Sequence, residues 1–332
     1  MSLSIVATLY RSADTVEPFY TRMAAAAQKL GEPYELVLVN DGSPDDSLAI
    51  ALRIASRDPA VKIVDLSRNF GHHRAMMTGL AHASGDRVFL IDSDLEEDPE
   101  LLEEFDKEMK QRDVDVVFGV QRRRKGGTIE RVTGSMFYTI FNALSTHRIP
   151  PSLLTVRLMS RRYVDALLEH REREITIGGL WAITGFAQHP VVVTKHSRGT
   201  TSYDLRRKVW HLVDSITAFS NKPLVMIFYL GIAISTLAGA AAALLIVRRI
   251  FFGVLLMGWP SLIVSVWLLG GITLLCLGII GIYLSKIFLE TKQRPPSIVR
   301  QVTGVGLGAA DDRATRDADR KSGERGGVRL RA

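Results

Sequence analysis

The sequence predicts an α/β domain with a mostly parallel sheet, followed by an amphipathic helix and a hairpin of two membrane-spanning helices. Short apolar runs alternate with helix-length segments through the first 120 residues, and two long uncharged segments lie near the C-terminus. Alternating strands and helices are typical of a parallel sheet covered on both faces. A charged fraction of 23% and a hydrophobic fraction of 47% exclude a disordered chain and an entirely membrane-embedded one.

The N-terminal elements follow from apolar runs bounded by turn residues. The expected strands are Ser4–Leu9, Glu35–Asn40, Val61–Leu66, Arg87–Asp92 and Val114–Val120. The expected helices are Val16–Leu30, Asp45–Arg57, His73–Ala83 and Pro99–Arg112. The second helix has a predicted N-cap at Ser43, with Pro44 at its first position and Asp46 as the capping-box acid.

The alternation of expected strands and helices ends after residue 120. A basic loop at 122–127 precedes an expected helix at about 130–144, and no strand can be assigned between 145 and 200. Further on, apolar residues recur at spacings of four and three, and basic residues lie between them. The apolar residues are Leu205, Val209, Leu212, Ile216 and Phe219. This pattern predicts an amphipathic helix in the membrane interface.

Residues 223–247 and 261–285 carry no charge, and each exceeds the roughly 20 residues that cross a bilayer as a helix. Lys and Arg cluster before the first span and after the second, which predicts that both termini and the globular domain are cytoplasmic at the inner membrane. The net charge of +7 could indicate nucleic acid, but this clustering favours a membrane surface, so no nucleic-acid partner is expected.

The chain is therefore divided into four parts. The globular domain covers residues 1–203, the amphipathic helix 204–222, the membrane hairpin 223–286 and a cytoplasmic tail 287–332. Because the tail is rich in Gly, Asp and Arg, we expect it to be largely disordered from about residue 304.

Open parallel sheets bind ligands beyond the carboxyl ends of their strands. Asp41 follows the second expected strand, where its carboxylate can accept hydrogen bonds from a ribose or a base edge; a turn with a helix cap is the alternative. The third strand is followed by a polar loop that contains His72 and His73. Adjacent histidines seldom ligate one metal, so this loop is expected to position a substrate.

The most informative cluster is Asp92-Ser93-Asp94 at the end of the fourth expected strand. Five carboxylates lie within the seven residues 92–98. Asp92 and Asp94 project to the same side of an extended chain, and hard oxygen ligands suit Mg²⁺ or Mn²⁺, which also hold phosphates. The alternative is that Asp98 caps the next helix and the other acids are solvated. Neither a Gly-x-Gly-x-x-Gly nor a P-loop pattern follows a strand, which disfavours a redox dinucleotide and an ATPase.

The segments VATLY, VLVNDGSPDDS, LSRNFGHHRAMMTGLAHASGD and FLIDSDLEEDPE together resemble the family 2 glycosyltransferases, which have the Rossmann-like GT-A fold. The likeness is greatest to the polyprenyl-phosphate glycosyltransferase type, which includes dolichyl-phosphate mannose synthase and the bacterial undecaprenyl-phosphate glucosyl and aminoarabinosyl transferases. Further similar segments are Arg157–Ser160, Gly178–Trp181, Lys195–Tyr203 and Ser220–Leu224. The resemblance covers residues 1 to about 290.

The resemblance implies sugar transfer from a nucleotide-sugar to polyprenyl phosphate, such as undecaprenyl phosphate. It favours a UDP-sugar donor, with GDP-mannose as an alternative, and implies a homo-oligomer. The implied catalytic residues are Asp92, Asp94 and Arg198, with Asp92 and Asp94 holding Mg²⁺ or Mn²⁺. The implied donor-binding residues are Tyr10, Asp41, Ser93, Glu96 and Arg131. The implied phosphate-binding residues are Arg198 and Lys208. Attraction to anionic headgroups is an alternative for Lys208.

Three positions depart from the family pattern. The usual Pro-x-Tyr-Asn-Glu opening keeps only Tyr10, the usual glutamine after the DxD motif is Glu96, and Thr155 stands where some relatives carry an aspartate proposed as a base. The last change is chemically tolerable, because a phosphomonoester has a second pKa of about 6 and is largely deprotonated at neutral pH.

The implied mechanism is an inverting displacement, and its product is a lipid-phosphate sugar donor for cell-envelope glycan or lipopolysaccharide modification. One alternative is a non-catalytic membrane scaffold with a degenerate GT-A domain, and another is a glycosyltransferase with a different acceptor. A processive polysaccharide synthase is disfavoured because the chain lacks a Gln-x-x-Arg-Trp motif.

Overall fold

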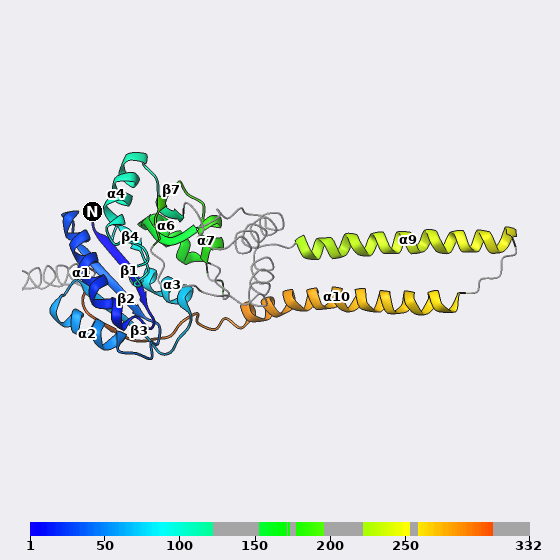
Figure 1. Cartoon of the computed structure of the whole chain (residues 1–332), viewed down its shortest axis with the longest axis horizontal. Helices are drawn as coiled ribbons and strands as arrows, with labels where there is room; N and C mark the ends of the chain where they lie inside the picture. Colours follow the sequence, from blue (N-terminus) through cyan, green and yellow to red (C-terminus); the bar gives the residue numbers. More distant parts are fainter. Residues whose placement is uncertain (122–152, 171, 173–176, 196–221, 253–257, 308–332) are drawn as a thin grey trace, which may run out of the picture. The chain divides into compact units, whose positions relative to one another are not determined.

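The computed structural model describes residues 1–121, 153–170, 172, 177–195, 222–252 and 258–307 (Figure 1). The strands are β1 (Leu3–Leu9), β2 (Tyr34–Asn40), β3 (Val61–Leu66), β4 (Arg87–Leu90), β5 (Val116–Gln121), β6 (Leu153–Ser160), β7 (Gln188–Val193) and β8 (Val299–Thr303). The helices are α1 (Ala13–Lys29), α2 (Ser47–Arg57), α3 (His72–His82), α4 (Leu101–Arg112), α6 (Arg161–Glu169), α7 (Ile177–Ile183), α9 (Lys222–Phe252) and α10 (Trp259–Thr291). The expected loop at 122–127 and the expected helices at about 130–144 and at 205–219 lie outside the described residues.

The described strands form one sheet in the order β7-β5-β6-β4-β1-β2-β3-β8. β1 pairs in parallel with β2 and β4, β2 with β3, and β5 with β7. Two strands run antiparallel to their neighbours, β6 against β4 and β5, and β8 against β3. The prediction of a mostly parallel sheet is therefore confirmed, while β6, β7 and β8 have no counterpart among the expected strands.

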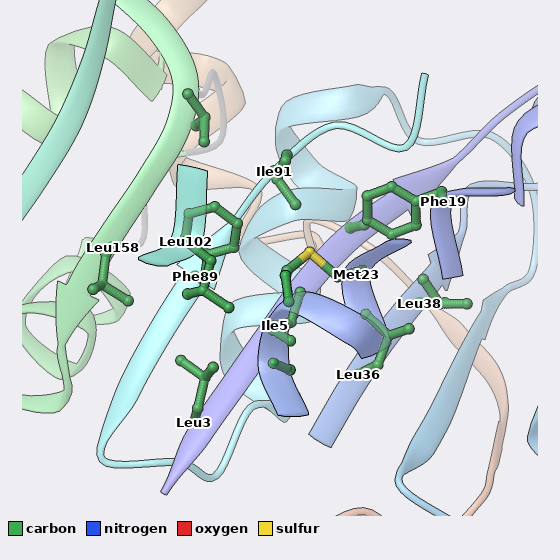
Figure 2. Packing of buried hydrophobic residues seen from close by; sticks show 14 of the residues in the cluster. Leu3, Ile5, Phe19, Met23, Leu36, Leu38, Phe89, Ile91, Leu102 and Leu158 are labelled. Carbon is green, nitrogen blue, oxygen red and sulfur yellow. The ribbon is translucent and has the colours of Figure 1, made fainter. Parts of the chain in front are cut away.

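Helices cover both faces of the sheet and form two hydrophobic cores. α1, α2 and α4 pack on one face, whereas α3, α6 and α7 pack on the other. Side chains along β1 alternate between these faces, with Ile5 and Leu9 in the first core and Val6 in the second. Figure 2 shows Phe19 and Met23 of α1 packed in the first core. Strands that are apolar on both sides are buried on both sides, as a parallel sheet requires.

The helix caps differ from the predicted ones. Ser43 is not an N-cap, because α2 begins at Ser47 and it is the Asp45 carboxylate that accepts a hydrogen bond from the Ser47 amide at 3.2 Å. α4 begins after Glu100, and the Asp98 carboxylate accepts a hydrogen bond from Arg22 of α1 at 2.8 Å. A contact of this kind, between residues of different elements, is not visible in the local sequence.

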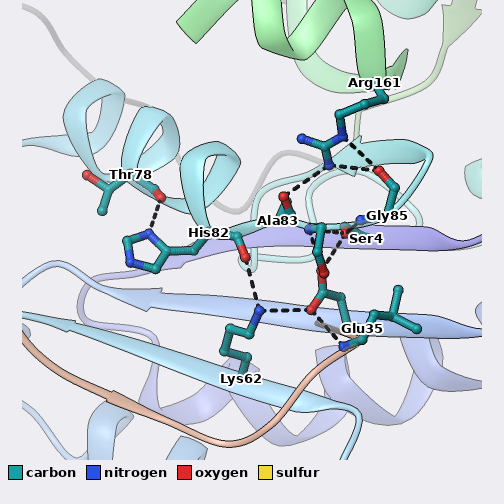
Figure 3. A network of polar contacts seen from close by, with 10 residues as sticks. Ser4, Glu35, Lys62, Thr78, His82, Ala83, Gly85 and Arg161 are labelled. Carbon is teal, nitrogen blue, oxygen red and sulfur yellow. Dashed lines mark hydrogen bonds and ion pairs between the residues drawn. The ribbon is translucent and has the colours of Figure 1, made fainter. Parts of the chain in front are cut away.

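The amino edge of the sheet is closed by a buried polar network around Glu35 (Figure 3). Its carboxylate accepts hydrogen bonds from Ser4 Oγ at 2.6 Å, the Ser84 amide at 2.7 Å, Lys62 Nζ at 3.0 Å and the Leu307 amide at 3.1 Å. Burial by itself would raise the pKa of Glu35, but these hydrogen bonds outweigh it and hold the pKa below its usual value. The network joins β1, β2 and β3 to the chain that follows β8.

β8 adds to the sheet beside β3, where the sequence indicates only a tail. Its residues Val299–Thr303 are half-buried or exposed, so the strand lacks the apolar alternation by which strands are identified. Edge strands are held mainly by backbone pairing, and that pairing depends on a neighbouring edge that local sequence does not show. The chain after α10 therefore returns to the globular domain.

The described residues form two compact units, one with the sheet and its helices and the other with α9 and α10. α9 and α10 contact each other. Within the described residues, one segment, Ser265–Thr291 of α10, is long and apolar enough to cross a membrane, with a mean hydropathy of 2.2. The apolar part of α9, Lys222–Ala238, is shorter. The two-span hairpin accordingly stays a prediction.

Candidate active site

Polar loops follow β1, β2, β3 and β4 at the carboxyl edge of the sheet, opposite the Glu35 network. Side chains join these loops across the edge. The Arg11 amide donates to Ser43 Oγ at 2.7 Å, which ties the loop after β1 to the loop after β2. Ser93 Oγ donates to the Thr8 carbonyl at 2.7 Å, which ties the loop after β4 to β1. The predicted clusters that the structure describes are therefore brought together at one edge.

Asp92 is oriented by a histidine from the neighbouring loop. His72 begins α3, and its Nε2 lies 3.2 Å from Asp92 Oδ1 while its Nδ1 shares a hydrogen bond with Thr8 Oγ1 at 3.0 Å. Burial lowers the pKa of His72, but the contact with Asp92 and the charges of Asp41 and Asp94 outweigh that effect and raise the pKa. His72 thus holds one carboxylate of the DxD motif in place, a role that the sequence did not assign.

Ser93 and Asp94 lie in different environments. Ser93 is buried, and its hydroxyl faces β1. Asp94 is exposed, and its Oδ1 accepts a hydrogen bond from the Glu96 amide at 2.9 Å. Leu95, the residue after Asp94, has a φ of +60°, a left-handed conformation that costs a non-glycine residue energy and occurs often at functional sites. The loop therefore presents Asp94 outward in a locally strained turn.

The negative charges of this loop change the acidity of Asp94. Partial desolvation raises the pKa of Asp94, the hydrogen bond from the Glu96 amide lowers it, and the neighbouring carboxylates of Asp92 and Glu96 raise it further. The net pKa lies above the usual value for an aspartate. Carboxylates that repel one another in this way are stabilised by a bound cation.

Asp41 is buried and anchors the loop after β3. Its Oδ1 accepts a hydrogen bond from the Phe70 amide at 2.7 Å, and its Oδ2 accepts one from the Gly71 amide at 3.0 Å. Burial raises the pKa of Asp41 although both amide bonds lower it. A carboxylate oxygen can accept a second hydrogen bond, so the group is held in one orientation while retaining free acceptor capacity.

Tyr10 stands at the exposed rim of the same edge. Its side chain is 44% exposed, and the Arg11 guanidinium lies 5.7 Å from the centre of its ring. Arg11 has a φ of +53°, so the turn after β1 is strained in the same way as the turn at Leu95. An exposed aromatic ring beside these polar loops offers a surface on which a base can stack.

Lys195, two residues beyond β7, meets the acidic loop after β4. Its Nζ lies 2.8 Å from Glu96 Oε2 and 3.3 Å from Glu97 Oε1. Burial lowers the pKa of Lys195, but both carboxylates outweigh this and raise it. Glu96, which the resemblance places in the donor site, is thus ion-paired in this structure.

Glu97 is the residue of this loop that the sequence analysis did not single out. It is 0% exposed, and the Lys195 ammonium lies beside its Oε1. The pKa of Glu97 is raised to about 7; burial is the largest cause, Asp92 and Asp94 contribute, and Lys195 opposes the increase. The five acidic residues within 92–98 indicate that a cation is needed near them. The sequence does not identify Lys195 as that cation, because β7 was not expected.

The residues that are present fit a divalent cation of the Mg²⁺ type. Among the described residues no group of three or more His, Cys, Asp or Glu side chains is arranged to hold a metal ion. Mg²⁺ is commonly bound by one or two carboxylates and completes its shell with water and substrate phosphates. Asp92, oriented by His72, and the exposed Asp94 would supply those two carboxylates. The same finding gives no support for zinc at His72 and His73.

Several predicted residues lie outside the described part of the chain, namely Arg131, Arg198 and Lys208. Thr155 is in β6, and its carbonyl accepts a hydrogen bond from the fully buried Arg157 at 3.3 Å. The Arg157 guanidinium lies 3.0 Å from the centre of a Trp181 ring, and burial lowers its pKa to about 9. Arg157, part of a segment that carries the resemblance, is therefore a core residue.

The sequence of this chain is similar to those of several known proteins. Residues 4–168 match the family described as Glycosyl transferase family 2. The chain is 53% identical over 307 residues to a protein of Mycobacterium tuberculosis described as "Putative glycosyltransferases", covering 92% of this chain and 90% of that one. It is 32% identical over 310 residues to a "Prophage bactoprenol glucosyl transferase homolog" of Escherichia coli, covering 91% of this chain and 99% of that one.

A solved mannosyltransferase from Pyrobaculum calidifontis, in complex with GDP-Man and Mn²⁺, is 18% identical. The alignment covers 87% of this chain and 84% of that one, with a TM-score of 0.46.

Proposed function

Because the chain belongs to glycosyltransferase family 2, we propose that it transfers a sugar from a nucleotide-sugar to a polyprenyl phosphate at the cytoplasmic face of a membrane. The observation that carries this proposal is the position of the DxD motif. Asp92 and Asp94 leave β4 at the carboxyl edge, where the loops after β1, β2 and β3 also meet. That edge is where α/β sheets bind nucleotides.

The donor is proposed to lie along these loops. Asp41 and Tyr10 supply a fixed acceptor and an exposed ring for the nucleoside, and a UDP-sugar is favoured, with GDP-mannose as the alternative. Asp92 and Asp94 would hold Mg²⁺ or Mn²⁺ against the diphosphate. Ser93 and Glu96 support this loop through their contacts with β1 and Lys195. Arg131 is proposed to contact the donor as well.

The acceptor is proposed to be polyprenyl phosphate, of which undecaprenyl phosphate is the bacterial form. Relatives at 32% identity are named bactoprenol glucosyl transferases, and bactoprenol is a polyprenol. Arg198 and Lys208 would attract the lipid phosphate, and α9 and α10 would form the two-span hairpin with both chain ends cytoplasmic. The protein is further proposed to form a homo-oligomer in the inner membrane.

The reaction is proposed to be a single displacement that inverts the anomeric carbon. One oxygen of the lipid phosphate forms the new bond to that carbon as the bond to the nucleoside diphosphate breaks. The attacking phosphate is already largely deprotonated near pH 7, so the chain mainly has to position it and offset charge repulsion. A bound divalent cation would neutralise the charge that develops on the leaving diphosphate.

The test uses the full-length protein with undecaprenyl phosphate and a panel of UDP-, GDP- and dTDP-sugars, with and without Mn²⁺. We expect one donor class to give a lipid-linked sugar, and we expect Asp94→Asn to abolish transfer while membrane insertion is unchanged. The matched control is Asp46→Asn, which makes the same change at an aspartate of the loop before α2. Wild-type transfer by Asp94→Asn would contradict the assignment of the DxD motif. Metal-independent nucleotide binding with no transfer to any acceptor would favour the scaffold alternative.

A further inference from the structure

β8 is the edge strand beside β3, and its first residue pairs with the last residue of β3. The strand is antiparallel to β3, so it starts beside the carboxyl end of β3 and runs toward the amino edge. Two contacts hold the residues that come directly before β8. The Ser67 amide donates to the Ile298 carbonyl at 2.9 Å, and Ser297 Oγ lies 2.7 Å from Thr78 Oγ1 of α3. The chain that follows α10 thus reaches the edge that carries the nucleotide loops.

A β-bulge redirects the side chain of Arg300. In the register of β3 and β8, Asp65 pairs with Gln301 and Leu66 pairs with Val299, so Arg300 is the additional residue between them. Bulges change the direction of a side chain and are frequent near active sites. The Arg300 Nη2 donates to the Ser67 carbonyl at 2.7 Å, and its Nη1 lies 3.4 Å from Asp65 Oδ2.

Arg300 begins a continuous polar chain into the donor loops. Asp65 Oδ1 accepts a hydrogen bond from Asn40 Nδ2 at 2.7 Å, and Asn40 Oδ1 accepts one from the Ser43 amide at 3.2 Å. Ser43 Oγ in turn accepts a hydrogen bond from the Arg11 amide at 2.7 Å. Asn40 and Asp65 are buried, so their orientations depend on these partners and not on solvent. This series of polar contacts ends between the loop that carries Tyr10 and the loop that carries Asp41.

The far end of β8 is also anchored. The Leu307 amide donates to Glu35 Oε2 at 3.1 Å in the network at the amino edge (Figure 3). Gly306 has a φ of +55°, and a Cβ at this position would collide with the Glu35 carboxylate. The close approach therefore requires glycine, and it gives β8 a definite register against β3. With both ends of the strand anchored, the bulge is held opposite Asp65.

We propose that Arg300 is a positioning residue for the nucleotide-sugar donor: through Asp65, Asn40 and Ser43 it orders the two loops that carry Tyr10 and Asp41. This inference rests on the proposed function, because it takes those loops to be the donor site. Arg300 itself does not touch the reacting atoms. Without its guanidinium, the Asp65 carboxylate loses its contact with Arg300 and is held less firmly where it accepts the hydrogen bond from Asn40. The donor site then becomes less ordered, and the donor binds more weakly.

The test compares Arg300→Ala, Arg300→Lys and Gln301→Ala in the full-length protein reconstituted in lipid nanodiscs. Gln301 is the matched control, since it is the next exposed residue of the same strand. Because the Arg300 side chain is 58% exposed, we expect a donor KM raised about three- to tenfold in Arg300→Ala. The acceptor KM, the kcat and the melting temperature should stay near those of the wild type. Arg300→Lys should recover part of the loss, because it keeps the charge without the planar fork.

Three kinetic results would overturn the inference. These are an unchanged donor KM in Arg300→Ala, an equal rise in the donor and acceptor KM, and an effect of Gln301→Ala as large as that of Arg300→Ala. All three presuppose a wild-type protein that transfers sugar. A wild-type protein that binds no nucleotide-sugar would instead contradict the proposed function, so the two failures are distinguishable. A melting temperature that falls in Arg300→Ala and is not restored in Arg300→Lys would assign Arg300 a purely structural role and overturn the inference as well.

Discussion

Lys195 and Glu97 form an ion pair between the end of β7 and the loop after β4, with 3.3 Å between Lys195 Nζ and Glu97 Oε1. In the sheet, β5 and β6 separate these two strands. Glu97 is fully buried, so solvent does not stabilise its charge. The ammonium of Lys195 is therefore the cation that makes burial of this carboxylate tolerable beside Asp92 and Asp94.

We expect Lys195→Ala to lower the free energy of unfolding by about 2 kcal/mol, because it leaves a buried carboxylate without its cation. Lys195→Arg should retain most of the stability. Thermal unfolding of the full-length protein in detergent measures both. The matched control is Lys29→Ala, which removes an ion pair of 2.8 Å with Glu103 between exposed side chains and should have little effect. Equal effects of Lys195→Ala and Lys29→Ala would contradict the role given to the buried pair.

The stability of the metal-free protein should depend on pH through Glu97. Its pKa in the folded protein is about 7, above the usual value, so the folded state holds the proton more tightly than the unfolded state. The stability that this group contributes is present at low pH, and it is lost as the pH rises from the unfolded pKa through about 7. Glu97→Gln cannot ionise and avoids this loss, which is on the order of 3 kcal/mol when complete.

Melting temperatures of the wild type and Glu97→Gln, measured in chelator between pH 5 and pH 8.5, check this expectation. The advantage of the variant should grow up to about pH 7.5 and then level off. Glu100→Gln is the control, because the hydrogen bond from Arg22 lowers the pKa of Glu100 and its contribution changes only at more acidic pH. A difference between wild type and Glu97→Gln that is constant across this range would show that Glu97 is ionised or solvated throughout.

Gly42 should be more sensitive to substitution than Gly31, a glycine that also has a positive φ. It has a φ of +59°, and a Cβ there would collide with the backbone of Arg68 and Asn69. Gly31 has a φ of +68°, but no heavy atom outside its own chain neighbours lies within 4 Å of the point that a Cβ would occupy. Gly31→Ala should therefore cost about 1 kcal/mol from backbone conformation alone. Gly42→Ala should cost about 2 to 3 kcal/mol, because the loops after β2 and β3 must also separate.

Donor titration adds a functional measurement to this comparison. Because Gly42 lies beside Asp41, Gly42→Ala should weaken nucleotide binding, whereas Gly31→Ala should leave it unchanged. Isothermal titration of a nucleoside diphosphate to the full-length protein would show this. Similar affinities in both variants would mean that the approach of these two loops does not shape the donor site.

Much of the fold and of the candidate site could be predicted because the relevant signals are local. β1 to β5 and the helices between them follow from runs of apolar residues, and the observed bounds differ from the expected ones by a few residues. The position of Asp92 and Asp94 at the end of β4 also follows, since an apolar run that ends in two acids shows where a buried strand meets solvent. By contrast, the cap expected at Ser43 is wrong, because Asp45 lies closer to the first amides of α2 and Ser43 is bonded to Arg11.

The sequence by itself determined the α/β class, the acidic motif at a strand end and the apolar segments near the C-terminus, because composition and periodicity report on burial along one stretch of chain. Only the tertiary structure decided that Lys195 meets Glu97, that His72 orients Asp92 and that Arg300 reaches Asp65. Each of these pairs joins residues from different elements, and sheet order places them together. The polar partners of a site depend on which strands become neighbours, and that choice results from packing of the whole domain.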